Sequence, residues 1–310
     1  MPPSAKRTGI TLVFVATDEK DYLIDGISSA FQNRPRRPLE VILVDNSSSD
    51  GTADTVRKKW PNVKVLEQEE RRGLYSNLNL GIGEASHGYI TICNCDIVFQ
   101  KGALEGLAQL LDRRPQAGLV APLLQSPDGL RRPSARRWYT WPVLLALKGP
   151  WRERLSGLPL VKRSVYEDWD HKEARKVDWA PCPAAMVRGS ALEDIGPLDE
   201  SFTVYFGDSD LCLRLHEKAW EVWCDPAAAV VHHEQRASKR ILTRLWWWHL
   251  SSLIRFWVKH RGLRPKRRLA NQPSIPRAED AVTADDVAKA TGSAEQVESA
   301  GGGAEDLSQT

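Results

Sequence analysis

The sequence of 310 residues has few of the features that mark secreted or membrane-spanning proteins. Its five cysteines are odd in number and widely scattered, which excludes the paired framework of a small disulfide-rich domain. No apolar run reaches the about 18 residues that a membrane-spanning helix needs. The N-terminal stretch 1–7 lacks the apolar core of a secretory signal. These absences predict a cytoplasmic protein.

The residues that are present predict a globular body followed by an acidic tail. Hydrophobic residues make up 42% of the chain and charged residues 27%, as in a soluble protein with a sizeable core. Residues 271–310 hold two basic and eight acidic side chains, a net charge of −6, and no aromatic residue. Because such a segment buries too little apolar surface to offset its ordering entropy, we expect it to be disordered. The remaining chain then carries a net charge of +9, which favours an anionic partner: a phosphorylated ligand, a membrane surface or nucleic acid.

The first 125 residues alternate strand and helix patterns. Short apolar runs predict strands at 10–16, 39–44, 63–66, 89–93 and 118–121, and helical patterns fall at 22–32, 49–60, 76–85 and 102–111. This order predicts an α/β fold, with a Rossmann-like, mostly parallel sheet that is flanked by helices on both faces. Ligands in such sheets bind at the carboxyl ends of the strands.

Polar side chains follow three of these predicted strands. Asp18 comes after the first strand, Asp45 and Asn46 come after the second, and Asn94 and Asp96 come after the fourth. Each of the three carboxylates alone fits a helix cap or a turn equally well. Because parallel strands end at one edge of a sheet, we expect the three carboxylates to converge on one crevice.

The turn after the first strand excludes several kinds of nucleotide-binding protein. It reads Thr-Asp-Glu-Lys at 17–20 and contains no glycine, whereas a dehydrogenase has Gly-x-Gly-x-x-Gly here. A P-loop is also missing, as is the glycine- and arginine-rich loop of sugar nucleotidyltransferases. The remaining possibility is a nucleotide site built from side chains, with the diphosphate neutralised by a metal on Asp96.

Several motifs stand in a fixed order between Thr11 and Gly262. Residues 44–52 read Val-Asp-Asn-Ser-Ser-Ser-Asp-Gly-Thr, residues 72–81 contain Gly-x-x-x-x-x-Asn-x-Gly, and residues 94–96 read Asn-Cys-Asp. Farther along come Asp-Trp at 178–179, Met-Val-Arg at 186–188, a long acidic and aromatic segment at 198–214 and His-His-x-x-x-x-Ser at 232–238.

These motifs resemble those of family 2 glycosyltransferases, which have the GT-A fold, and in particular their rhamnosyltransferase-like subset. Residues 44–52 are similar to the signature Asp-Asn-x-Ser-x-Asp-Gly-Thr, and residues 94–96 stand in the place of the metal-binding Asp-x-Asp. Residues 178–179 and 186–188 resemble the acceptor-side strand of that subset. Residues 198–214 match its segment Phe-Asp-Glu-x-Phe-Phe-x-Tyr-x-Glu-Asp-x-Asp-Leu-Cys-x-Arg.

The resemblance implies roles for individual residues of a nucleotide-sugar site. Asp45 would form a hydrogen bond with the pyrimidine base, and Asp96 would hold Mg²⁺ or Mn²⁺. His232 would complete the metal shell; His233 competes for that role, and a structural histidine is an equal alternative. The further residues expected to bind the nucleotide sugar are Ala16, Thr17, Asp18, Asn46, Arg72, Gly73, Asn77 and Asn94.

On the acceptor side, Asp208 would be the general base that takes the proton of the acceptor hydroxyl. Asp210, two residues later, would orient the start of a helix or contact the acceptor. Two departures from the family pattern stand beside this group. Gly207 replaces the usual glutamate before the catalytic aspartate, and Cys182-Pro183 replaces the usual Gly-Ala.

A basic stretch with aromatic residues follows the first half of the chain. Residues 131–176 hold twelve basic and five acidic side chains, interleaved with Trp138, Tyr139, Trp141 and Trp151. The basic stretch 131–137, with these aromatic residues, would bind a lipid pyrophosphate or an anionic glycan; a solvated basic loop is the alternative. Arg136, Arg137 and Trp179 are the residues expected to bind the acceptor. No motif supports nucleic acid as a partner.

The stretch 241–260 predicts an amphipathic helix. Its apolar face comprises Leu242, Leu245, Trp246, Leu250, Leu253 and Trp257, and basic residues stand opposite. This pattern fits a helix in a membrane interface, which would place the protein on the inner face of the plasma membrane, and fits equally a helix packed on the sheet.

These observations predict one GT-A unit in which 1–125 binds the nucleotide sugar and 126–240 is the acceptor-binding and catalytic half. A basic amphipathic helix at 241–270 and the acidic tail at 271–310 follow. The expected function is inverting, metal-dependent transfer from a UDP- or dTDP-sugar to a glycan or lipid-linked acceptor of the cell envelope. A catalytically weak relative that serves as a glycan-binding or scaffold subunit is the alternative, motivated by Gly207.

Overall fold

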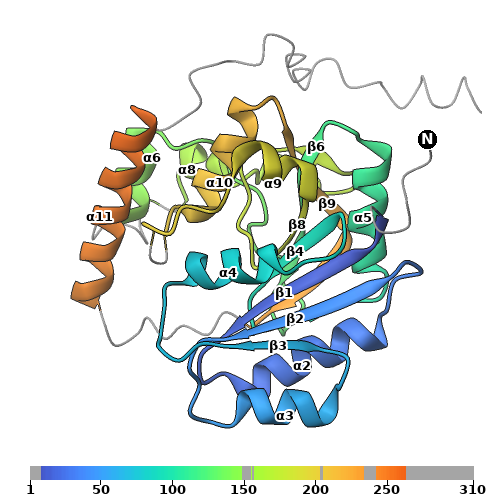
Figure 1. Cartoon of the computed structure of the whole chain (residues 1–310). Helices are drawn as coiled ribbons and strands as arrows, with labels where there is room; N and C mark the ends of the chain where they lie inside the picture. The colour runs from blue at the N-terminus through green and yellow to red at the C-terminus, as the bar shows by residue number, and fades with distance from the viewer. Residues whose placement is uncertain (1–7, 149–154, 156, 203–204, 234–241, 263–310) are drawn as a thin grey trace, which may run out of the picture. The chain divides into compact units, whose positions relative to one another are not determined.

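The computed structural model describes residues 8–148, 155, 157–202, 205–233 and 242–262, and the side chains of all of these except 145–148 and 242–249 (Figure 1). The predictions for Trp151, Ser238 and the tail 271–310 lie outside the described residues, as do those for the side chains of Leu242, Leu245 and Trp246. The described residues belong to one unit, Met1–Arg267.

Four parallel strands form the half of the sheet that the sequence predicts. Their order is β3-β2-β1-β4, with bounds Lys64–Glu67, Leu39–Asp45, Ile10–Ala16 and Tyr89–Cys93. The helices between and after them are α2 (Lys20–Gln32), α3 (Thr52–Lys59), α4 (Leu74–Gly83) and α5 (Ala103–Arg113). The Asp50 carboxylate helps to start two of these helices, because it accepts the N–H groups of Lys20 at 3.1 Å and Thr52 at 3.0 Å.

The other half of the sheet mixes directions. β8 (Ala184–Arg188) runs antiparallel between β4 and β6 (Ala117–Gln125), and β6 runs parallel to β9 (Glu221–His232). Two short strands, β5 (Ile97–Phe99) and β7 (Arg175–Lys176), pair antiparallel with β9. The sheet is therefore mixed beyond β4, because the chain returns along 126–183 to the edge where β4 ends, and β8 starts there with Ala184 opposite Cys93.

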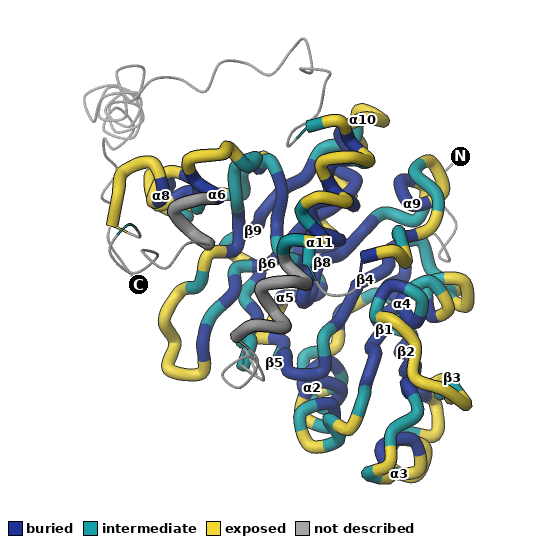
Figure 2. The backbone as a smooth tube through the Cα atoms, turned by 90° about the vertical axis from the view of Figure 1, so that its left-hand side faces the viewer, coloured by how far each residue is buried: buried dark blue, intermediate teal, exposed yellow. Residues whose placement is uncertain are grey.

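Two apolar layers sandwich the sheet, as the dark blue strands and helix faces of Figure 2 show. Along β1, Ile10, Leu12 and Phe14 face the layer under α2 and α5, whereas Val13 and Val15 face the layer under α4. Gly81 lets α4 lie against β1, since a Cβ there would stand 2.4 Å from a methyl group of Val13. This close packing holds the start of α4 beside the strand ends.

Further helices cover the same face as α4. They are α6 (Trp141–Lys148), α8 (Pro159–Ser164), α9 (Gly189–Ile195), α10 (Gly207–Glu217) and α11 (Leu242–His260). Within the described residues, no helix is both long and apolar enough to cross a membrane.

The expected C-terminal helix is present as α11, and it packs on the fold through Ser252, Phe256 and His260, which are all buried. Trp257, which the sequence pattern places on the apolar face, is 47% exposed. The buried face is rotated toward Phe256 and His260, because these side chains meet the aromatic ring of Phe206, just before α10, and the carboxylate of Asp210 within it.

Candidate active site

The ends of β1 and β2 and the start of α4 form the first part of the site. Ala16 pairs with Asp45 at the last register position of the two strands, and Asp45 is almost fully buried. The Asn46 side chain donates to Thr17 Oγ1 at 3.0 Å and to the Arg72 carbonyl at 3.2 Å, and it accepts the Arg72 N–H at 2.7 Å. Asn46 therefore ties both strand ends to the loop that precedes α4.

Two other residues predicted to bind the nucleotide sugar hold loops in place. The Asp18 carboxylate accepts the Ser49 N–H at 2.7 Å and forms an ion pair with Arg71, and the Ser49 N–H is the main cause that lowers the pKa of Asp18. Asn77 is buried and donates to the Gly73 carbonyl at 3.2 Å. The structure thus brings the expected residues of β1, β2 and α4 together at one sheet edge.

Asp96 lies in the loop between β4 and β5 at this edge and is only 7% exposed. Its Oδ1 atom stands 3.2 Å from Nε2 of His232, at the end of β9. The His233 ring instead packs edge-on against Tyr22, with centroids 5.5 Å apart. His232, rather than its neighbour, therefore faces the carboxylate that was expected to hold a metal.

Glu19 is a member of this group that the sequence reasoning missed. Burial, and next to it the charge of Asp96, raise the pKa of Glu19, whose side chain is hydrogen-bonded to Cys95. Its only signal in the sequence is its place in the polar turn after β1. Glu19 adds a second carboxylate beside Asp96.

These residues fit a divalent cation that is shared with a bound diphosphate. In the part of the chain that the structure describes, no group of three or more His, Cys, Asp or Glu side chains is arranged to hold a metal alone. Mg²⁺ in nucleotide sites needs only one or two carboxylates, because phosphate oxygens and water complete its shell. Asp96 with His232, and Glu19 nearby, meets that requirement.

Asp208 lies in the first turn of α10 and is partly buried. Its Oδ2 atom accepts the Cys182 N–H at 3.2 Å, and the Tyr75 hydroxyl donates to the same carboxylate. Burial raises the pKa of Asp208 to about 6, although both hydrogen bonds and the charge of Arg136 oppose the rise. A carboxylate with this pKa is charged at neutral pH and basic enough to accept a proton in a transfer step.

Short links join Asp208 to the loop that holds Asp96. Cys182 donates its N–H to Asp208, and the next carbonyl, that of Pro183, accepts the Asn94 N–H at 2.8 Å. Because the contact uses the backbone of Cys182, the departure from Gly-Ala at 182–183 leaves it intact. The expected base and the expected cation ligand therefore lie on one continuous edge.

Asp210 is directed away from this crevice. It is 2% exposed, and its carboxylate contacts Lys259 Nζ at 2.6 Å, His260 Nε2 at 2.7 Å and Arg214 Nη1 at 3.5 Å. These contacts fasten α11 to α10. An acceptor-binding role for Asp210 is not supported by this surrounding.

The remaining residues expected to bind the acceptor separate into two groups. Arg137 is directed toward Asp168, at 2.8 Å, and donates through Nε to the Arg163 carbonyl. Trp179 is buried, and its indole N–H donates to the Arg137 carbonyl at 3.1 Å. Arg136 lies 5.6 Å from the Trp179 ring and acts electrostatically on Asp208. Arg136 alone of the three stands beside the expected base.

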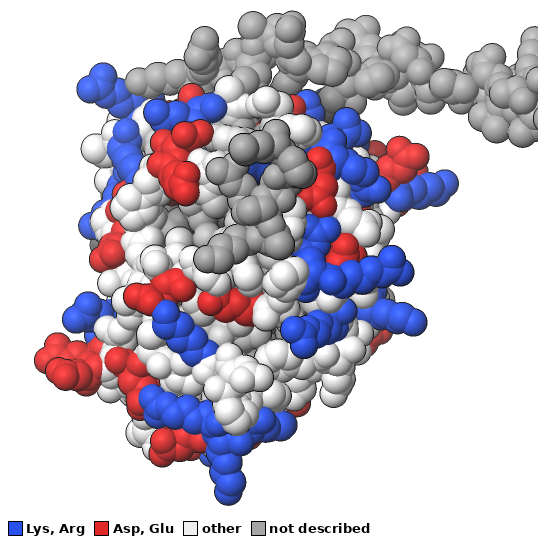
Figure 3. Space-filling model, turned by 45° about the vertical axis from the view of Figure 1, so that its right-hand side comes forward, with Lys and Arg blue, Asp and Glu red and all other residues white. Residues whose placement is uncertain are grey.

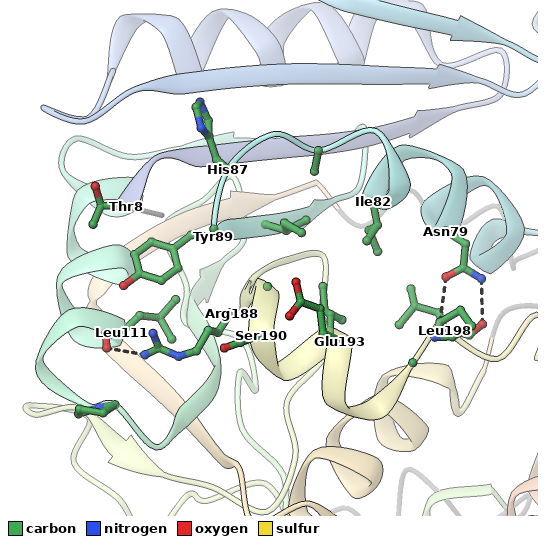
Figure 4. Close-up of a pocket in the computed structure, with 18 of the residues that line it drawn as sticks. Thr8, Asn79, Ile82, His87, Tyr89, Leu111, Arg188, Ser190, Glu193 and Leu198 are labelled. Carbon is green, nitrogen blue, oxygen red and sulfur yellow. Dashed lines mark hydrogen bonds between the residues drawn. The ribbon is translucent and has the colours of Figure 1, made fainter. Parts of the chain in front are cut away.

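A large pocket of about 1020 Å³ lies at the opposite edge of the sheet, where β1 and β4 begin (Figure 4). Two of its polar side chains are engaged with the fold: the Arg188 guanidinium donates to the carbonyls of Leu111 at 2.7 Å and Ala117 at 3.0 Å. The Tyr89 hydroxyl donates to Asp112 at 2.6 Å. This pocket is therefore separate from the crevice of Asp96 and Asp208.

The chain is similar to known glycosyltransferases in both sequence and fold. Residues 11–168 match the family model "Glycosyl transferase family 2". Over 212 residues, 63% of this chain and 67% of the relative, it is 30% identical to the N-acetylglucosaminyl-diphospho-decaprenol L-rhamnosyltransferase of Mycobacterium tuberculosis. It is 28% identical over 199 residues to the pre-mycofactocin glycosyltransferase of the same organism, 63% of this chain and 38% of that protein.

Solved structures share the fold at low sequence identity. A mannosyltransferase of Pyrobaculum calidifontis in complex with GDP-Man and Mn²⁺ superposes with a TM-score of 0.55 at 18% identity, over 79% of this chain and 64% of that chain. Residues 1–349 of Staphylococcus aureus TarS superpose with a TM-score of 0.51 at 16% identity, over 77% and 64%. The chain therefore spans just under two thirds of each of these structures. Family model, relative and fold agree: this chain belongs to glycosyltransferase family 2 and is a glycosyltransferase with a GT-A-like fold.

Proposed function

We propose that the crevice between Asp45, Asp96 and Asp208 transfers a sugar from a UDP- or dTDP-sugar to a lipid-linked or glycan acceptor, with inversion at the anomeric carbon. One observation carries this proposal. A single carboxylate with a near-neutral pKa, Asp208, is linked through Cys182 and Pro183 to the loop of Asp96. One base beside a carboxylate that would hold the cation of the diphosphate suits a single displacement, which inverts the configuration.

The donor nucleotide would lie over the ends of β1 and β2. There Ala16, Thr17 and Asp45 meet, and Asn46 holds the loop of Arg72 and Gly73 next to them. Asp96, with His232 and Glu19, would hold Mg²⁺ or Mn²⁺ against the diphosphate. The cation, when bound, supplies positive charge that stabilises the leaving nucleoside diphosphate.

The acceptor hydroxyl would approach from the side of α10. Asp208 accepts the proton of this hydroxyl while the hydroxyl oxygen attacks the anomeric carbon, on the face opposite the departing diphosphate. Cys182 and Tyr75 hold the carboxylate by hydrogen bonds, and Arg136 favours its charged form. Gly207 and Cys182-Pro183, the two departures from the family pattern, remove no group that these steps use.

A lipid-linked acceptor of the cell envelope is part of the proposal because of the relatives. The rhamnosyltransferase of M. tuberculosis is named for N-acetylglucosaminyl-diphospho-decaprenol, a lipid diphosphate. In this chain, Arg136 is partly exposed and acts electrostatically on Asp208, and its charge matches that of a diphosphate. A rhamnosyl donor follows from the same relationship.

A screen of nucleotide sugars by thermal stabilisation, with and without Mn²⁺, tests the proposed donor. A ligand at 100 times its dissociation constant should stabilise the protein by about 2.7 kcal/mol. We expect a UDP- or dTDP-sugar to raise the melting temperature in the presence of Mn²⁺, and GDP- or CMP-sugars to leave it unchanged. Stabilisation by GDP-sugars alone would contradict the proposed donor class.

The alternative function, a glycan-binding or scaffold subunit, is motivated by Gly207. It predicts no turnover of any nucleotide sugar, with or without acceptor, together with saturable binding of a glycan. Turnover of any donor with release of the free nucleoside diphosphate excludes it.

We further propose that α11 contacts the surface of an anionic membrane. Ile254, Trp257 and Val258 lie on adjacent turns of α11 and are 52%, 47% and 61% exposed, and Arg255 beside them is exposed as well. Exposed tryptophan with basic neighbours is typical of helices in a membrane interface. On the face shown in Figure 3, basic and acidic groups are interspersed. The buried face of the same helix stays on α10.

Co-sedimentation with anionic liposomes tests this contact. We expect binding at low salt and release at high salt, because the screening length is only about 10 Å at 0.1 M ionic strength. Trp257→Ala should weaken binding. Leu130→Ala is the matched control, because Leu130 is 62% exposed but lies in a turn after β6. Equal binding by both variants, or no binding of the wild type at low salt, would contradict the contact.

A further inference from the structure

Gly207, the first residue of α10, lies directly against Tyr75 of α4. A Cβ atom built at this position would lie 2.0 Å from Cζ and 2.1 Å from Oη of Tyr75. Real Cβ contacts are essentially never shorter than 3.0 Å, so no side chain fits at position 207 while Tyr75 stays in place. Tyr75 is 5% exposed, and it belongs to the apolar layer under α4. Its ring therefore has little room to move away.

The hydroxyl of the same tyrosine is hydrogen-bonded to Asp208, the residue that follows Gly207. Other groups also face this carboxylate: the Cys182 N–H at 3.2 Å, the Arg136 guanidinium, and Tyr139, whose hydroxyl pairs with Ser209 at 3.0 Å. Among these groups, Tyr75 alone both contacts the carboxylate and fills the space over Gly207.

We infer that Tyr75 is a positioning residue for the Asp208 carboxylate, and that Gly207 is present because its missing side chain admits the Tyr75 ring. In this chain the Tyr75 ring occupies the space that the Cβ atom of any side chain at position 207 would need. The inference rests on the proposed function, in which Asp208 is the base. It assigns a specific role to Tyr75, a residue that the sequence motifs leave without one.

A thermal double-mutant cycle tests the packing part of this inference. Gly207→Ala should lower the melting temperature, because the new Cβ overlaps the Tyr75 ring, although alanine is otherwise the better residue in a helix. In a Tyr75→Ala background, the same Gly207→Ala change should leave the melting temperature unchanged or raise it. An equal loss in both backgrounds would overturn the pairing of these two residues.

Tyr75→Phe tests the positioning part, because it keeps the ring and removes the hydroxyl. Loss of this donor destabilises the charged carboxylate and raises its pKa, so the acid limb of kcat/KM should move by about one pH unit to higher pH. The expected loss is about five-fold at pH 6, approaches ten-fold below pH 5 and should disappear near pH 8. A merely structural defect would persist at both pH values. Tyr139→Phe is the matched control, since the Tyr139 hydroxyl is hydrogen-bonded to Ser209. The acid limb of kcat/KM should not move in this variant.

The same assay with Asp208→Asn distinguishes a failure of the inference about Tyr75 from a failure of the proposed function. If Asp208→Asn abolishes transfer and Tyr75→Phe keeps the wild-type pH profile, the inference about Tyr75 is wrong and the proposed base stands. If Asp208→Asn keeps normal transfer, the proposed function of the site fails first. A shifted limb in Tyr75→Phe together with the non-additive melting temperatures supports the inference.

Discussion

Asp208→Asn should slow sugar transfer by about 10²–10⁴-fold, the usual contribution of a general base. The amide keeps the size of the side chain and can still accept the Cys182 N–H, but it cannot take the proton of the acceptor hydroxyl. Donor affinity should stay close to wild type, because the carboxylate lies on the acceptor side of the crevice. Initial rates at saturating donor, together with a titration of donor binding, measure both quantities.

Asp199→Asn is the matched control for this variant. Asp199 lies in the segment before α10 and pairs with Lys259 at 2.6 Å, which leaves it outside the crevice. Its loss should leave the transfer rate nearly unchanged. Asp210→Asn is less suitable, because a buried carboxylate that holds Lys259 and His260 contributes to stability. Near-normal transfer by Asp208→Asn would show that another group is the base.

Asp96→Ala should abolish the metal-dependent part of nucleotide-sugar binding and leave the protein folded. The side chain lies at a strand end and contacts His232, and the backbone carbonyl that accepts the His233 N–H is retained. Calorimetric titration of the donor with and without Mn²⁺ measures the effect. The expected result is a binding curve that no longer responds to Mn²⁺.

The two neighbouring histidines provide a matched pair for this prediction. His232→Ala should weaken Mn²⁺-dependent binding, because His232 faces Asp96. His233→Ala should leave it unchanged, because that ring packs against Tyr22. If Asp96→Ala keeps the wild-type Mn²⁺ response, Asp96 does not hold the cation.

Local sequence patterns predicted the half of the fold that short apolar runs define. The runs at 10–16 and 39–44 are buried in the sheet, and the rule that ligands bind at strand ends predicts that Asp45 and Asp96 lie at one edge, as they do. The mixed half was not predictable in the same way. The direction of β8 depends on where the chain returns after residue 126, and no local pattern encodes that return.

The parts of the site that the sequence did not reveal depend on contacts between distant segments. Gly207 reads as a lost glutamate until Tyr75 is found in the space above it. Asp210 reads as an acceptor contact until α11 supplies His260 and Lys259. Glu19 is one polar residue of a turn, and only the fold brings it near Asp96. Each of these contacts joins segments that no local spacing relates.

The central claim is that two carboxylates of one crevice serve one reaction in different roles, Asp96 in donor binding and Asp208 in proton transfer. The most direct test measures donor occupancy and single-turnover transfer in parallel for both variants, with Mn²⁺ present. The account predicts that Asp208→Asn binds the donor fully and transfers it about 10²–10⁴-fold more slowly, whereas Asp96→Ala loses occupancy itself. Equal losses of binding in both variants, or normal transfer by Asp208→Asn at full occupancy, would contradict it.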